Sequence, residues 1–126
     1  MILLELPKKF KLKKDAYTRR RGTPKMLFIC CSSCNNYIIS YQKDGPGPLL
    51  RCYLDRIHHP EQLQKLQNIC THKNECPFLE CDTCKTTIGV PYVYEKEDRL
   101  AYAMQPGSFI LKKKKLLELS KDTRLR

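Results

Sequence analysis

The chain has 126 residues, 41% of them hydrophobic and 29% charged, which is enough for one folded domain and excludes a disordered chain. It contains no tryptophan, which excludes a binding site built from tryptophan rings. Its apolar runs are shorter than the ~20 residues that cross a membrane, and Glu5 and Pro7 leave too little for a signal-peptide core. Eight cysteines in such a chain indicate a reducing, intracellular compartment, cytoplasm or nucleus, where paired cysteines bind metal more often than they form disulfides.

The net charge of +11 is concentrated at the two ends. Residues 1–24 hold eight basic and two acidic residues, residues 111–126 hold seven and two, and residues 25–110 hold nine of each. This partition predicts a neutral folded domain over 25–110, a basic N-terminal arm over 1–24 and a basic C-terminal arm or helix over 111–126. Phosphates attract such arms, so the expected partner is nucleic acid, with RNA or a ribonucleoprotein favoured. Alternatively, the arms bind an acidic protein or lipid headgroups, or they serve only as a localisation signal or as solubilising tails. The candidate nucleic-acid contacts are Arg19, Arg20, Arg21, Lys112, Lys113, Lys114 and Lys115.

Between the arms, the sequence predicts a mainly β (α+β) domain with one short helix. Prolines and glycines at residues 44–48 predict a hairpin turn, because they suit neither a helix nor a central strand. Pro60 begins the predicted helix, in which Leu63, Leu66 and Ile69 recur every three residues, and a polar loop follows over 70–77. Apolar, β-branched and aromatic residues predict strands over 26–30, 37–41, 49–57, 78–81, 88–94, 99–104 and 108–111.

Two Cys-x-x-Cys pairs, Cys31 with Cys34 and Cys81 with Cys84, carry the clearest chemical signal. A two-residue gap lets the chain turn and present both thiolates to one ion, so two pairs predict a tetrahedral four-sulfur zinc site. The long segment between them fits two strand-end turns from separate sheets that share the ion. A redox dithiol, buried cysteines and disulfides are the alternatives, although β-rich sequence rather than a helix follows each pair. Four thiolates leave zinc no open position, so the site predicts no activation of water.

The other cysteines allow two interpretations. Cys30 is predicted to enter the core while Cys31 binds the ion, because neighbours on a strand point to opposite faces. Small buried side chains are the ordinary role of isolated cysteines, but a second metal site is the alternative. Its candidate ligands are Cys70, His72 and Cys76, completed by Cys52 or by His58.

Residues 79–112 have a characteristic order of motifs. A Cys-x-x-Cys pair is followed by an apolar-glycine step at Ile88 and Gly89, aromatic strands and a closing Gly-x-Phe-Ile-Leu strand that ends at Leu111. This order resembles the C-terminal half of Yippee-type domains of the β-tent group, and by spacing the resemblance extends over residues 26–112. It implies two small antiparallel sheets pinned at their apex by one zinc ion. Some β-tent relatives bind imides through a tryptophan cage, which this chain lacks, and others bind RNA ends or reduce methionine sulfoxide.

Three functions follow as hypotheses. The leading one is a non-enzymatic zinc module that binds nucleic acid through its basic arms, with Tyr37, Tyr41 and Tyr92 as candidate stacking faces. The second is a Yippee-type protein-interaction adaptor whose arms serve localisation. The third is a thiol-dependent methionine sulfoxide reductase using Cys52, because residues 44–52 resemble the reductase segment before its nucleophile. That segment follows the first cysteine pair here and the second pair in the reductases, so no catalytic residue is predicted.

Overall fold

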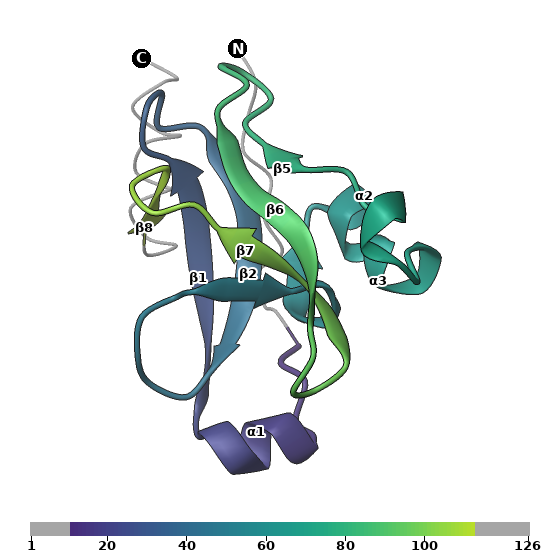
Figure 1. Ribbon diagram of the computed structural model, residues 1–126. Coiled ribbons are helices and arrows are strands. Elements are labelled where there is room, and N and C mark those ends of the chain that lie inside the picture. The colour runs from purple at the N-terminus through teal and green to yellow at the C-terminus, as the bar shows by residue number, and fades with distance from the viewer. Residues whose placement is uncertain (1–10, 113–126) are drawn as a thin grey trace.

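Two four-stranded antiparallel sheets form the domain, as the sequence predicts (Figure 1). The computed structural model describes residues 11–112. One sheet has the strand order β4-β2-β1-β8 and the other β3-β7-β6-β5, so each sheet combines strands from distant parts of the chain. The strands are β1 (Pro24–Cys31), β2 (Tyr37–Asp44), β3 (Arg51–Tyr53), β4 (Ile57–His59), β5 (Leu79–Glu80), β6 (Thr87–Tyr94), β7 (Arg99–Met104) and β8 (Phe109–Lys112).

Within residues 11–112, the helical segments are all short and lie outside the sheets (Figure 1). They are the α-helices α1 (Ala16–Arg21), α2 (Glu61–Gln64) and α3 (Leu66–Ile69), and the 3-10 helices η1 (Leu54–Arg56) and η2 (Lys73–Glu75). The single helix predicted after Pro60 is therefore two short helices that meet at Lys65. No helix within residues 11–112 is long and apolar enough to cross a membrane.

The core lies between the two sheets, where the inward faces of their strands meet. Ile29 and Ile39 from the first sheet and Ile88 and Tyr102 from the second are all fully buried in one cluster. Cys30 joins a smaller cluster with Phe28, on the face of β1 opposite to Cys31, as the alternation along a strand predicts.

The strand predicted over 49–57 is wrong in one respect, because η1 interrupts it. β3 pairs with β7 in one sheet, and after η1 the chain enters the other sheet as β4, which pairs with β2. The three-residue turn thus moves the chain between sheets. The pattern of apolar residues does not reveal this change of sheet, because both strands bury apolar side chains in the same core.

The hairpin turn predicted over 44–48 is also wrong. β2 and β3, which flank this segment, belong to different sheets, so the segment is a crossover loop. Gly45 packs against the end of α1: its φ is +84°, and a Cβ there would lie 2.1 Å from the Arg21 carbonyl oxygen. Glycine is required here because both the conformation and the space exclude a side chain.

α1 lies in the segment predicted to be the N-terminal arm, and it packs on the domain. Asp15 caps the helix by accepting hydrogen bonds from the backbone N–H groups of Tyr17 and Thr18. The same carboxylate lies 2.6 Å from the buried guanidinium of Arg56. The described part of the basic N-terminal segment is therefore attached to the domain by a helix cap and an ion pair.

Candidate metal centre

The four predicted cysteine ligands lie in two hairpin turns at one end of the domain (Figure 1). Cys31 ends β1 and Cys34 lies in the turn to β2; Cys81 follows β5 and Cys84 lies in the turn to β6. One hairpin belongs to each sheet, so the cluster links the two sheets. This is the arrangement that the cysteine spacing predicts.

The two turns have the same backbone pattern. In the first, the N–H of Asn35 donates to the Cys31 carbonyl at 2.9 Å, and in the second, the N–H of Lys85 donates to the Cys81 carbonyl at 2.9 Å. Asn35 and Lys85 both have a positive φ, of 65° and 64°. This repeated turn brings both sulfurs of each pair close to the sulfurs of the other pair.

The four Sγ atoms lie within 4.8 Å of one another. Cys31 Sγ is 3.5 Å from Cys84 Sγ, and Cys34 Sγ is 3.4 Å from Cys81 Sγ, so each short distance joins one hairpin to the other. A tetrahedral ion with metal–sulfur bonds of about 2.3 Å separates its ligand sulfurs by about 3.8 Å. The cluster has the size of such a site, and its geometry makes it a candidate metal centre.

The environment of the cluster favours the thiolate at two of the four cysteines, Cys31 and Cys81. Burial opposes ionisation of Cys31, but hydrogen bonds from the backbone N–H groups of Cys34 and Ser33, together with the Cys84 thiol, lower its pKa to about 6. Burial likewise opposes ionisation of Cys81, and the Cys84 backbone and the Cys34 thiol lower its pKa. At Cys34 a backbone hydrogen bond from Asn36 lowers the pKa, but the Cys81 thiol and burial raise it to about 12. Thiolates are the form that binds metal, so the turns favour the binding form at Cys31 and Cys81, and an ion would have to displace the proton of Cys34.

Neighbouring side chains hold the hairpin turns in place. The Asn36 side-chain amide donates to Cys81 Sγ at 3.7 Å, which connects the two turns directly. Ser32 donates from its backbone N–H to the Ser108 carbonyl at 3.0 Å and from its hydroxyl to the Gly107 carbonyl at 2.7 Å. The turn between β7 and β8 thereby supports the first cysteine pair. Spacing predicts the ligands, but these supporting contacts depend on the folded arrangement and were not predicted.

The alternative of a second metal site is not supported by the geometry. Within residues 11–112, the four cysteines above are the one group of three or more metal-binding side chains close enough to share an ion. The Cys70 thiol approaches the backbone carbonyl of Glu75, and the Cys76 thiol approaches that of His72. Cys52 is fully buried in the core beside β7. The remaining candidate ligands, His72 and His58, complete no set of three with these cysteines.

The candidate nucleic-acid contacts fall into three groups. Arg19 and Arg20 are exposed on α1, and Arg20 lies 3.8 Å from the Glu97 carboxylate. Arg21 is partly buried and donates to Glu97 and to the Tyr53 hydroxyl. Lys112 ends β8, opposite Phe28 of β1, so the segment assigned to the C-terminal arm begins inside a strand. The other three, Lys113, Lys114 and Lys115, lie outside the described residues.

The candidate stacking tyrosines are all engaged by neighbours. Tyr41 is only 2% exposed and accepts a hydrogen bond from the Tyr53 backbone N–H, so its proposed role as a stacking face is wrong. Tyr37 is half-buried against His59, and the Tyr92 hydroxyl accepts from Arg51 Nε at 2.7 Å. These three tyrosines therefore contribute to the packing and to the hydrogen bonds of the two sheets.

Two buried arginines, Arg56 and Arg99, make contacts that the sequence did not predict. Arg56 is ion-paired to Asp15 and Asp44, and Arg99 to Asp55 and Glu97. Arg99 also lies 3.7 Å from the ring centre of Tyr17 and 3.6 Å from that of Tyr53. These groups are far apart in the sequence, so no local spacing signals them; their role is to hold α1 on the sheets.

Comparison of the chain with protein-family models, with curated proteins and with solved structures finds no match. What the structure supports is a domain of two antiparallel sheets linked by a tetra-cysteine cluster, consistent with a zinc-binding β domain. The Yippee-type resemblance stays a prediction from the sequence motifs.

Proposed function

We propose that this chain is a non-enzymatic, zinc-stabilised β domain that binds nucleic acid, with RNA or a ribonucleoprotein as the favoured partner. The observation that carries the metal part is the convergence of four sulfurs from two sheets within 4.8 Å. Four thiolates in a tetrahedral arrangement are typical of structural zinc. When bound, zinc would supply a cross-link between the hairpins, held by Cys31, Cys34, Cys81 and Cys84.

The burial of Cys52 supports a binding role over a reductase role. Its side chain is fully buried, and burial raises the pKa of its thiol well above the usual value. A nucleophilic cysteine needs an accessible thiolate, which this environment opposes. Four thiolates around zinc also leave it no position for a substrate or a reactive water.

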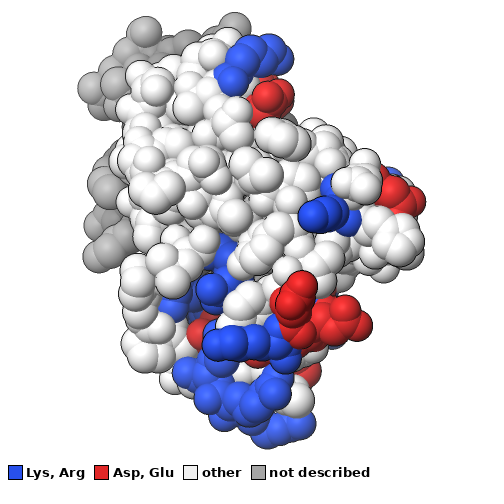
Figure 2. All heavy atoms as spheres, viewed as in Figure 1, with Lys and Arg blue, Asp and Glu red and all other residues white. Residues whose placement is uncertain are grey.

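The distribution of charge supports nucleic acid as the partner. The chain carries a net charge of +11, and Arg19 and Arg20 project from α1 into solvent. Figure 2 shows basic side chains gathered at the lower end of the molecule, where α1 lies. Such a surface attracts phosphates, and binding that rests on it weakens as salt rises.

The metal is tested by elemental analysis of the purified chain. We expect one zinc ion per chain, retained in the Cys52→Ser variant and lost in the Cys84→Ser variant. Cys84 is exposed, so its replacement removes a ligand without opening the core. A chain that keeps its ion and its fold after Cys84→Ser, or a chain without zinc, contradicts the proposal.

Nucleic-acid binding is tested by fluorescence anisotropy with a short labelled oligouridine between about 50 and 200 mM salt. Replacing Arg19 and Arg20 by glutamine should reduce the log–log salt slope by about 0.7 for each phosphate that these side chains neutralise. Replacing Lys113, Lys114 and Lys115 should act in the same way. The matched control replaces Lys65 and Lys73, which are exposed on the helical segments away from α1.

A protein-interaction adaptor is the second candidate, and one observation favours it. Ile69 and Phe78 are 64% and 55% exposed, so large apolar side chains are available on the surface for contact with a protein. Oligouridine binding that is absent, or that ignores both salt and the arginine substitutions, would favour this adaptor function over nucleic-acid binding.

A further inference from the structure

A cavity of about 440 Å³ opens between the crossover loop and the sheets, at the end of the domain where α1 lies. Its volume falls in the range of ligand pockets, which is about 300–1,000 Å³. Pro46, Pro48, Leu49 and Leu50 form an apolar wall. The remaining lining comes from β2, β3 and the end of α1, and it includes three basic side chains: Arg21, Lys43 and Arg51.

The positive charge of the cavity is only partly compensated. The one acidic residue in its lining, Asp44, is already engaged, because its carboxylate accepts from Arg56 Nε at 2.9 Å and from Gln42 Nε2 at 2.9 Å. Arg21 is paired with Glu97. Within the described residues, no carboxylate lies within ion-pair distance of Lys43 or Arg51. Lys43 Nζ donates to the neutral carbonyl of Gly45 at 2.7 Å, which leaves its charge uncompensated. The cavity therefore presents two cations that an anionic ligand can neutralise.

Lys43 also faces a like charge across the sheet. It lies directly opposite Lys25 in the register of β1 and β2, and like charges in this position destabilise a sheet. Burial lowers the pKa of Lys43, and the charges of Lys25 and Arg21 lower it further. An anion bound beside Lys43 would relieve this repulsion.

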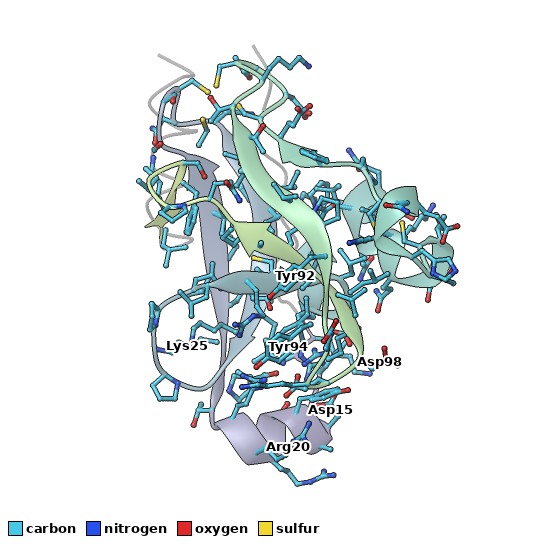
Figure 3. The ribbon with its side chains drawn as sticks, in the orientation of Figure 1. Asp15, Arg20, Lys25, Tyr92, Tyr94 and Asp98 are labelled. Carbon is cyan, nitrogen blue, oxygen red and sulfur yellow. The ribbon has the colours of Figure 1, made fainter. Side chains whose placement is uncertain are left out.

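Arg51 is held in position by aromatic side chains of β6. Its Nε donates to the Tyr92 hydroxyl at 2.7 Å, and its guanidinium lies 4.2 Å from the ring centre of Tyr94. Both tyrosines are labelled in Figure 3, on the strand above α1. A guanidinium held over an aromatic ring suits phosphate contact and stacking against a nucleobase.

We propose that this cavity binds one nucleotide unit of a single-stranded nucleic acid, with the phosphate at Lys43 and Arg51 and the base against the loop wall. A strand is favoured over a free nucleotide because further cations continue from the cavity: Arg21 ends α1, which carries the exposed Arg19 and Arg20. Figure 2 shows basic atoms in a hollow left of centre and a larger basic group below it. This inference rests on the proposed nucleic-acid binding and names a site for it.

The test uses a matched pair of exposed leucine and isoleucine side chains. Leu50 at the rim of the cavity is 62% exposed, and Ile69 on α3 is 64% exposed, so glutamate at either position leaves the core intact. Leu50→Glu places a carboxylate beside the proposed phosphate position and should weaken binding of a labelled oligouridine by about fivefold or more. Ile69→Glu should leave it unchanged. Arg51→Gln should weaken binding as well, and Arg51→Lys should restore only part of it because lysine lacks the planar guanidinium that lies over Tyr94.

The outcomes separate this inference from the proposed function. If Leu50→Glu and Ile69→Glu act alike, or if Arg51→Gln has no effect while replacement of Arg19 and Arg20 still weakens binding, the cavity is not the site and the chain remains a nucleic-acid binder. If uridine monophosphate binds as tightly as the oligouridine, the strand assignment is wrong. If the unaltered chain binds neither, both proposals are wrong.

Discussion

At one end of the domain four thiols from two hairpins face one another, whereas at the other end two buried arginines hold α1 on the sheets (Figure 1). Both ends join segments that are distant in the sequence. The thiol end has the size of a metal site, and the ion that we propose for it is not supplied by the chain itself. The arginine end uses the charges of Arg56 and Arg99, each with two carboxylate partners.

This difference predicts different sensitivities. A metal cross-link is lost all at once when the ion is removed, and it closes the long loop between the two cysteine pairs. The arginine contacts are graded, because each ion pair or ring contact contributes a part and the partners remain after one is removed. Loss of the metal should therefore be the largest single perturbation of the fold.

The first prediction concerns Cys34→Ser. Because three sulfurs bind zinc much more weakly than four, the variant should lose its ion and most of its free energy of unfolding, which for a small domain is only about 5–15 kcal/mol. Circular dichroism and thermal melting at matched metal concentration measure the effect. The control Ser33→Ala changes an exposed neighbour in the same turn and should melt like the parent. A folded, metal-free Cys34→Ser variant would show that the hairpin end does not need the ion.

The second prediction concerns Arg56→Met. Removing this guanidinium leaves the Asp44 carboxylate, whose side chain is only 4% exposed, without its charged partner. We expect a loss of about 3 kcal/mol in the free energy of unfolding, with the zinc content unchanged. The double variant Asp44→Asn/Arg56→Met should recover part of that loss, because it no longer buries an unpaired charge. Urea denaturation of the metal-loaded single and double variants measures both losses of free energy. If the losses from Asp44→Asn and Arg56→Met simply add in the double variant, Asp44 and Arg56 do not interact.

The contrast between the ends also explains which features the sequence could predict. A Cys-x-x-Cys pair is local, and its chemistry follows from two residues three positions apart, so the four ligands were identifiable without a structure. The strands were identifiable for the same reason, because their composition and alternation are local. The ligand turns of residues 31–34 and 81–84 thus needed no knowledge of the sheets.

The arginine end depends on contacts that no local pattern contains. Asp15 and Arg56 are 41 positions apart, and Arg99 contacts Tyr17 across a still longer separation. From the sequence alone, Asp15 is one of the few acids in a basic segment, and the segment was assigned to an arm on that charge. In the structure its carboxylate caps α1 and pairs with a buried cation, so the net charge of a segment does not decide whether it packs.

The third prediction concerns Tyr17→Leu, which removes the ring that lies 3.7 Å from the Arg99 guanidinium but keeps an apolar side chain on α1. The cation–π contact should contribute about 1–2 kcal/mol to stability, because Arg99 is buried whereas Tyr17 is only partly buried. Hydrogen exchange of the α1 amides should increase in the variant. The control Arg19→Ala alters an exposed side chain on the same helix and should change stability by about 0.5 kcal/mol or less. Equal effects of the two variants would mean that the ring contact does not hold α1.

The last and smallest predicted effect is a pH dependence at His58, which lies beside Gln42 at 3.0 Å near the arginine end. Burial lowers the pKa of His58, and the positive charges of Lys13 and Arg56 lower it further. The unfolded chain therefore takes up a proton near pH 6.5 while the folded chain still excludes it, so the free energy of unfolding falls as the pH falls below about 6.5. His58→Gln should reduce this slope without removing it, because protonation of the metal thiolates adds its own acid sensitivity. Denaturation of metal-loaded protein between about pH 7 and 5 measures the slope, and the exposed His72→Gln variant is the control. Burial also lowers the pKa of the neighbouring His59, so identical slopes in the parent and His58→Gln would show that acid acts on this fold through other groups, such as His59 and the thiol end, and not through His58.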